Sequence, residues 1–186
     1  MPKHRRLEMI AILPKPREII TGRFVNDGIV PNNPDLPVVI CRDVITFGST
    51  DAEETQIFLG DQVSQNDWCC EWFGSVYRRL HYHSTAHEAL IVFKGIADLQ
   101  IGGKSGREFR VYPGDMILIP AGVGHERVFS AFDFIVFGCY PNGQQWDMQW
   151  GWRKNLADSL IRIAKVPIPK SDPLYGKNGP LRKQWK

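Results

Sequence analysis

The sequence predicts an all-β fold, a single β-barrel with a few flanking helices and extended terminal arms. Between residues 68 and 143, aromatic and β-branched stretches of five to nine residues alternate with turns rich in glycine and proline. No stretch of helical length separates them, which excludes parallel crossovers and favours a sandwich or barrel. Six of the thirteen prolines lie in residues 1–37 and four in residues 167–186. Because proline cannot donate to a strand ladder, we expect extended or turning arms at both ends.

The chain length of 186 residues corresponds to one domain, with enough buried surface to fold without disulfides. We expect an N-terminal arm over residues 1–37 and the barrel over residues 38–153. A short helix is expected near residues 51–60, since Asp51 is a good N-cap residue and helix-forming residues follow it.

The C-terminal segment, residues 154–186, is expected to pack on the barrel as a helix and a tail. Apolar residues recur there at helical spacing, from Leu156 through Leu160. This pattern predicts a helix over about residues 154–165, which Pro167 stops.

Charge and apolar patterning exclude two classes of partner. The balance of 23 basic and 20 acidic residues gives a net charge of +3, spread along the chain, so no basic stripe indicates nucleic acid. The apolar runs fall short of the roughly 20 residues that a membrane helix needs. The four cysteines include no Cys-x-x-Cys pair, and the basic N-terminal segment lacks a cleavage site. We therefore expect reduced thiols and a cytoplasmic protein that contacts neither nucleic acid nor membrane.

Histidines are concentrated in two short segments of the β-rich core. In a strand, His81 and His83 are two residues apart, so both rings emerge on one face with Cα atoms about 6.6 Å apart. That spacing suits two ligands of one metal ion. Glu88 follows at the start of the next strand, and His125 lies 37 residues further on, after a strand and a tight turn.

With these spacings the chain resembles the cupin superfamily. The first cupin motif is matched by His81, His83, Glu88 and Gly95, although its leading glycine, Gly74, stands one residue too far away. The second motif is matched by Gly114, Pro120, Gly122 and His125. Both motifs occur in order and at the expected separation, which makes the resemblance specific.

The resemblance implies a double-stranded β-helix, or jelly-roll barrel, with His81, His83, Glu88 and His125 around one metal ion in its mouth. Three imidazoles and a carboxylate suit a divalent Fe, Mn or Ni ion at an open site, with Zn a further option. Open positions would remain for water, substrate or oxygen. A barrel without metal is the alternative reading of the same residues.

His87 is a separate case, because strand alternation is expected to turn it away from an ion that Glu88 binds. It then either supports a ligand from behind or lies at the surface. Direct ligation by His87 is a third reading.

Strand alternation also selects candidates for substrate contact. Tyr77 and Arg79 share the face of the first histidine pair, and Arg127 and Phe129 share the face of His125. An arginine beside a metal could clamp a carboxylate, and a tyrosine could donate a proton. Phe129 stands where the second motif usually has an asparagine. This departure argues against the oxalate oxidation of the germin-like cupins and suggests a more apolar pocket.

The resemblance narrows to the small YjlB-type cupins of bacteria and fungi, a group without an assigned reaction. It spans about residues 24–186 and is carried by the segments 31–37, 81–88, 120–125, 140–143, 166–176 and 179–181. It therefore implies a fold and a site but not a reaction.

The expected function is that of a metal-dependent enzyme acting on a small organic molecule. Oxidation by O₂, of the dioxygenase or oxidase type, comes first, and isomerase or lyase chemistry second. His81, His83 and His125 would hold the ion, while Glu88 would add charge or act as a catalytic base. The alternatives are a non-catalytic barrel that binds or senses a small molecule, and a storage role. Single cupins commonly pair through edge strands, so a homodimer is expected.

Overall fold

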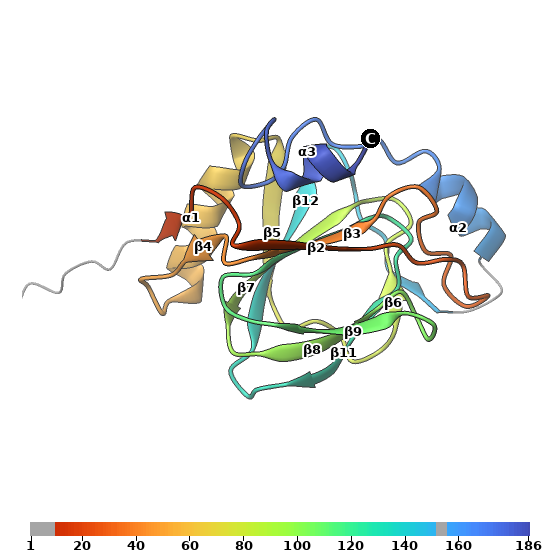
Figure 1. The fold of residues 1–186 in the computed structure, drawn as a ribbon, viewed down its shortest axis with the longest axis horizontal. Coiled ribbons are helices and arrows are strands. Elements are labelled where there is room, and N and C mark those ends of the chain that lie inside the picture. The colour runs from red at the N-terminus through yellow and green to blue at the C-terminus, as the bar shows by residue number, and fades with distance from the viewer. Residues whose placement is uncertain (1–9, 152–155) are drawn as a thin grey trace, which may run out of the picture.

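Two facing β-sheets form a jelly-roll barrel in the computed structural model, which describes residues 10–151 and 156–186 (Figure 1). The six-stranded sheet has the order β2 (Glu18–Gly22), β3 (Val38–Arg42), β10 (Met116–Ile119), β7 (Glu88–Lys94), β12 (Ile135–Pro141), β5 (Trp68–Gly74). The five-stranded sheet has the order β13 (Gln149–Trp150), β6 (His81–Tyr82), β11 (His125–Ser130), β8 (Ala97–Ile101), β9 (Arg107–Val111). β1 (Ala11–Ile12) and β4 (Ile45–Thr46) form a separate two-stranded sheet. All named pairs are antiparallel, as predicted for an all-β fold.

The four central strands of the six-stranded sheet are buried on both faces because each face is covered. Along β7, Leu90 and Val92 belong to the cluster between the two sheets, whereas Ala89 and Ile91 belong to a second cluster on the outer face. This alternation follows from the two-residue period of a strand. Glu88 lies two residues before Leu90, so its side chain points inward as well.

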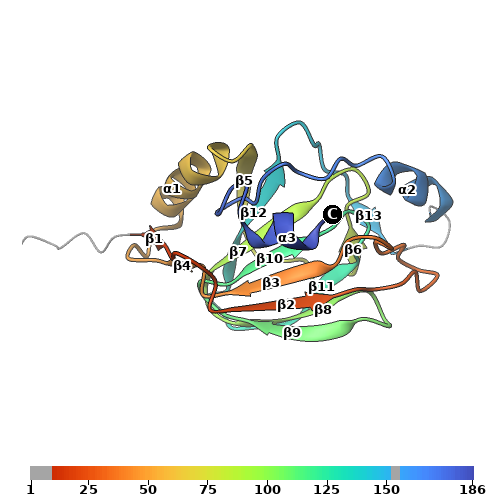
Figure 2. The same ribbon diagram turned by 45° about the horizontal axis from the view of Figure 1, so that its top comes forward.

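The outer cluster is covered by α1 (Ala52–Ser64) and α3 (Pro180–Gln184), which contribute Leu59, Val63 and Leu181. Figure 2 shows α1 and α2 (Leu156–Ile163) at opposite ends of the sheets, with α3 between them. The tail is tied to the barrel, since the indole of Trp185 donates to the Pro37 carbonyl at 2.8 Å.

Helix α1 runs beyond the expected range of 51–60. Asp51 is its N-cap, as predicted, and Oδ1 of Asp51 accepts from the amides of Glu53 and Glu54. The helix continues past Gly60 because Val63 is buried in the outer cluster. Tertiary packing here outweighs the roughly 1 kcal/mol cost of a glycine in a helix.

The N-terminal segment also differs from the expectation of an arm that ends at residue 37. β2 pairs with β3 along its whole length and forms one edge of the six-stranded sheet. Pro14 and Pro16 precede it, so the strand itself contains no proline. Helix α2 lies within the predicted range of 154–165, of which residues 154 and 155 fall outside the described part of the chain. In the described residues, no helix has the length and apolar character needed to cross a bilayer.

Candidate metal centre

Three histidines converge between the two sheets, and the strand pairing explains why. His81 in β6 lies directly opposite His125 in β11. His83 follows β6, and its carbonyl accepts from the amide of Gly122 at 2.7 Å. Gly122 has a φ of +92°, and a Cβ there would lie 2.6 Å from the Asn32 carbonyl oxygen, so the turn before His125 requires glycine. The HxH segment and the Pro-x-Gly turn are thus held together.

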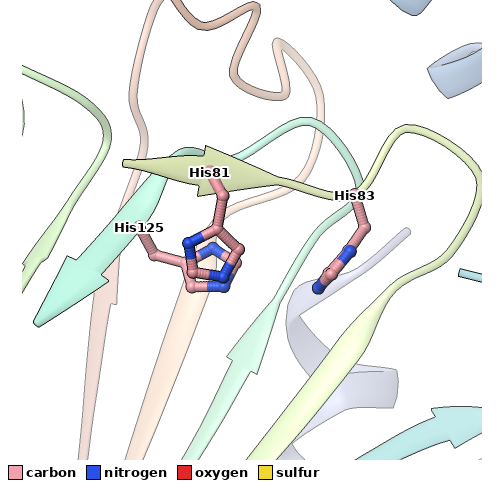
Figure 3. Close-up of side chains that lie close together, drawn as sticks. All are labelled: His81, His83 and His125. Atoms are coloured by element: carbon pink, nitrogen blue, oxygen red, sulfur yellow. The ribbon is translucent and has the colours of Figure 1, made fainter. Parts of the chain in front are cut away.

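The three rings form one compact group (Figure 3). One ring nitrogen from each of His81, His83 and His125 lies within 4.8 Å of the other two, and all three side chains are buried. The ring centroids of His81 and His125 are 4.1 Å apart, and His83 lies 5.7 Å from His125. The arrangement can bind a metal ion through three imidazoles.

Backbone carbonyls define which nitrogen of each ring carries the proton. Nδ1 of His81 faces the carbonyl of Arg79 at 2.9 Å, and Nδ1 of His125 faces that of Val123 at 3.1 Å. Nδ1 of His83 faces the carbonyl of Asp147. Because a carbonyl only accepts, each neutral ring carries its proton on Nδ1 and presents a free lone pair on Nε2. Metal-bound histidines are oriented by the same kind of contact.

Glu88 places a carboxylate oxygen beside two of these nitrogens. Its Oε2 lies 3.2 Å from Nε2 of His125 and 3.5 Å from Nε2 of His83. Donor atoms bound at about 2.1 Å to one ion and at right angles to each other are about 3 Å apart, which matches these contacts. The carboxylate is not part of the group of three nitrogens within 4.8 Å of one another. Glu88 therefore borders the histidine group on the side of His83 and His125.

The electrostatics of the group favour a bound cation. Burial opposes the charge on Glu88, but the attraction of His83 outweighs it and holds the pKa of Glu88 well below its usual value. Burial likewise opposes protonation of His83, and the charge of Glu88 raises the pKa of His83 nonetheless. Burial and the neighbouring His125 lower the pKa of His81 to about 3. Oε2 of Glu88 is buried without a hydrogen bond. Imidazole nitrogens beside a carboxylate oxygen that has no hydrogen bond form a donor set that fits a divalent metal ion.

Tyr140 and Trp72 hold the other oxygen of this carboxylate. The hydroxyl of Tyr140 donates to Oε1 of Glu88 at 2.6 Å and accepts from the indole of Trp72 at 3.0 Å. Burial, followed by the charge of Glu88, raises the pKa of Tyr140, so its hydroxyl stays protonated. A Cβ at Gly138 would lie 2.1 Å from the Trp72 ring, so this glycine leaves the space that the indole occupies.

The centre opens into a cavity of about 380 Å³. Its lining comprises the three histidines, Glu88 and ten further residues, Trp72, Phe73, Gly74, Ser75, Val76, Tyr77, Leu90, Tyr140, Trp146 and Met148. Among these, the sequence analysis did not select Trp72, Tyr140 or Trp146. Parity places Tyr140 on the inward face with Val136, but parity alone does not show that this strand borders the histidines.

Of the four predicted substrate contacts, the structure brings one into the cavity. Tyr77 lines it, with its ring 5.4 Å from that of His81. Arg79 lies outside the lining, with its guanidinium 4.6 Å from the Trp150 ring. Arg127 also lies outside and donates to the carbonyl of Val76 at 3.0 Å.

Phe129 is the fourth predicted contact, and its placement corrects the parity argument. A register shift in β11 between Arg127 and Phe129 breaks the alternation that starts at His125. Phe129 is 51% exposed and does not line the cavity. The apolar character predicted from Phe129 comes instead from other lining residues, among them Trp72, Leu90 and Trp146.

His87 is buried on the outer face of the six-stranded sheet, away from the histidine group. Its ring centroid lies 4.8 Å from that of Trp185, and its Nδ1 accepts from the amide of Ala121 at 3.0 Å. Burial lowers the pKa of His87 to about 3, so the ring is neutral. Strand alternation turned it away as expected, and its burial excludes the surface position. Its contact supports the turn that leads to His125.

Comparisons with known proteins agree with this fold. The cupin domain family matches residues 74–129. The chain is 37% identical over 169 residues to "Uncharacterized protein YjlB" of Bacillus subtilis (strain 168), covering 91% of this chain and 98% of that protein.

Two solved structures show a distant likeness. The DMSP lyase DddQ from Ruegeria pomeroyi DSS-3 matches at 13% identity and a TM-score of 0.32, over 64% of this chain and 45% of that one. An oxalate decarboxylase variant from Bacillus subtilis matches at 13% identity and a TM-score of 0.32, over 63% and 24%. This chain spans less than half of either solved protein. The match to YjlB covers nearly the whole of both sequences, and the chain therefore belongs to the cupins of the YjlB type.

Proposed function

We propose that the protein is a metal-dependent enzyme that acts on a small organic molecule bound in the cavity. The observation that carries this proposal is the convergence of three Nε2 lone pairs and an ionised carboxylate oxygen at one end of that cavity. Within residues 10–151 and 156–186, no hydrogen-bond donor satisfies Oε2 of Glu88. A divalent Fe, Mn or Ni ion fits such a donor set, and Zn is an alternative.

The roles of the chain's own residues follow from their contacts. His81, His83 and His125 would hold the ion, and Glu88 would add a charge or accept a proton from the substrate. Tyr140 keeps the carboxylate oriented, because its only proton is donated to Oε1 of Glu88. A bound ion would supply Lewis-acid or redox chemistry. Oxidation by O₂ is our first reaction class, and isomerase or lyase chemistry is the second.

Metal analysis of protein purified without chelator tests this proposal, followed by oxygen-uptake assays with candidate organic substrates. Stoichiometric Fe, Mn or Ni together with oxygen uptake supports the enzyme. Stoichiometric metal with substrate turnover but without oxygen uptake supports the isomerase or lyase class. A metal-free preparation that still binds a ligand contradicts the enzyme and favours a binding or sensing barrel.

Oligomeric state and compartment belong to the same proposal. We propose a homodimer that forms through a sheet edge, since β5, β2 and β9 are edge strands of the two sheets. We further propose a reducing, cytoplasmic compartment, because all four cysteines are free thiols. Light scattering on the purified chain tests the dimer, and fluorescence microscopy of a tagged chain tests the compartment.

A further inference from the structure

We propose that the cavity selects a planar aromatic molecule that carries hydroxyl groups, and not a small dicarboxylate. This inference names the substrate class of the proposed enzyme and therefore rests on the proposed function. It is carried by the aromatic rings beside the histidine group, by the charges of the cavity wall, and by one unsatisfied acceptor.

Aromatic side chains make up five of the fourteen residues that line the cavity, namely Trp72, Phe73, Tyr77, Tyr140 and Trp146. Leu90, Val76 and Met148 add further apolar surface. The cavity volume of about 380 Å³ lies near the lower end of the roughly 300–1,000 Å³ range of small-molecule pockets. A mono- or bicyclic ligand fits this volume.

Two of these rings contact different histidines of the group. Tyr77 contacts His81, with centroids 5.4 Å apart, and Trp146 contacts His83, with centroids 5.5 Å apart. Trp146 also stacks on Tyr140 at 5.6 Å with an interplanar angle of 19°. A flat ligand that approaches the histidines would therefore meet ring faces and edges, with which aromatic groups pack favourably.

Three of the aromatic rings that line the cavity are only partly covered by the protein. Tyr77 is 56% exposed, and Phe73 and Trp146 are each 38% exposed, although the histidines behind them are buried. Apolar area of this size at the mouth of a cavity gains free energy when a ligand removes it from water. An aromatic ligand body would cover it.

The charges of the wall disfavour a small dicarboxylate. No lysine or arginine occurs among the lining residues that the structure describes. Arg127, a predicted carboxylate clamp, donates to the Val76 carbonyl and to Ser130 outside the cavity. A carboxylate without a cationic partner from the chain would have to give up its hydration in an apolar cavity.

A hydroxyl group, by contrast, meets a matching acceptor. Oε2 of Glu88 is buried and makes no hydrogen bond, and Glu88 is one of the residues that line the cavity. The hydroxyl of Tyr140 cannot serve this oxygen, since it already donates to Oε1. A phenolic O–H of the ligand could donate to Oε2 and satisfy a group that is costly to leave unpaired.

Calorimetric titration with three probes tests the inference on the full chain, as purified and after dialysis against a chelator. Catechol is the aromatic diol, trans-cyclohexane-1,2-diol keeps the two hydroxyls without the ring, and oxalate is the dicarboxylate. In the chelator-treated protein we expect catechol to bind at least about tenfold more tightly than the saturated diol, and oxalate to bind more weakly than catechol. Trp146→Leu should weaken catechol binding about tenfold, whereas Phe132→Leu, at a fully exposed ring outside the cavity, should not change it.

Two results would overturn the inference: equal affinity for catechol and the saturated diol, or oxalate bound as tightly as catechol in the chelator-treated protein. Unchanged catechol binding in Trp146→Leu would overturn it as well. Metal content, measured separately on the same preparations, reports on the proposed function. Protein that holds no metal as purified, before any chelator treatment, but shows the catechol preference contradicts the enzyme and supports this inference. Protein that holds stoichiometric metal as purified but lacks the preference after chelator treatment does the reverse.

Discussion

The hydroxyl of Tyr140 determines which oxygen of Glu88 is available to the histidine group. Its single proton is donated to Oε1 at 2.6 Å, and the Trp72 indole donates to the same hydroxyl at 3.0 Å. The phenol cannot rotate toward the cavity without losing both contacts. Oε2 is consequently held beside the Nε2 atoms of His83 and His125.

Tyr140→Phe tests this positioning role. The variant removes the hydroxyl but keeps the ring that stacks on Trp146, so we expect a folded protein. Metal affinity should fall about 10–100-fold, the usual effect of losing a group that orients a ligand. A competition titration with a chromogenic chelator measures it. Tyr77→Phe is the matched control, because the exposed phenol of Tyr77 makes no contact with Glu88. Equal metal affinity in the two variants would contradict the role.

His87 is assigned here to the support of a turn, and a pair of variants separates that role from metal binding. His87→Phe leaves the buried amide of Ala121 without its acceptor, so the free energy of unfolding should fall by about 1–3 kcal/mol. Metal content should not change. His87→Gln retains an acceptor oxygen and should recover part of the loss. Urea denaturation and metal analysis of both variants check this, and loss of metal from a stable His87→Phe protein would instead make His87 a ligand.

At the level of secondary structure, helix α1 contains a glycine whose replacement by alanine should stabilise the protein. Gly60 lies inside the helix, and a Cβ placed there meets no atom within 4 Å. Gly60→Ala should therefore raise the free energy of unfolding by about 0.5–1 kcal/mol, because alanine loses less conformational freedom on folding. Urea denaturation measures the change.

Gly122→Ala should have the opposite effect and lower the free energy of unfolding. Its φ of +92° and the Asn32 oxygen 2.6 Å from a built Cβ both exclude alanine without a shift of the backbone. We expect a destabilised protein with weaker metal binding, since this turn leads into His125. A Gly122→Ala variant as stable as the wild type would show that the turn adapts, and a destabilised Gly60→Ala variant would show that α1 is strained there.

Strand alternation predicted side-chain directions well where strands are regular and failed where one is not. At the start of β7 it correctly turned His87 outward, and Glu88 inward like Leu90. Along β11 a bulge, which leaves no signature in one sequence, displaced Phe129 from the expected face. Trp72 and Tyr140 were missed for another reason. They reach the centre from strands distant in the chain, and only the sheet order shows that β5 and β12 border it.

In the whole molecule, the apolar clusters on the two faces of the six-stranded sheet are distinct from the candidate centre. The outer face packs against α1, α3 and Trp185 in a large apolar cluster. The inner face packs against the five-stranded sheet in a second cluster, and the histidine group lies beside that cluster at the cavity. Neither cluster includes a predicted metal ligand. The apolar clusters are therefore expected to stabilise the barrel without help from an ion.

His125→Ala tests this separation. The variant removes one imidazole from the centre and leaves both apolar clusters intact, so metal should be lost from a protein that still folds. The free energy of unfolding of the chelator-treated variant should lie within about 1–2 kcal/mol of that of chelator-treated wild type, since the ring also packs and its Nδ1 contacts the Val123 carbonyl. Circular dichroism, urea denaturation and metal analysis distinguish an ion that is bound by a folded barrel from an ion that the barrel needs in order to fold. Unfolding of the wild type on removal of metal would make the ion part of the barrel's structural core, because an ion bound only to a prefolded site can be withdrawn without loss of the fold.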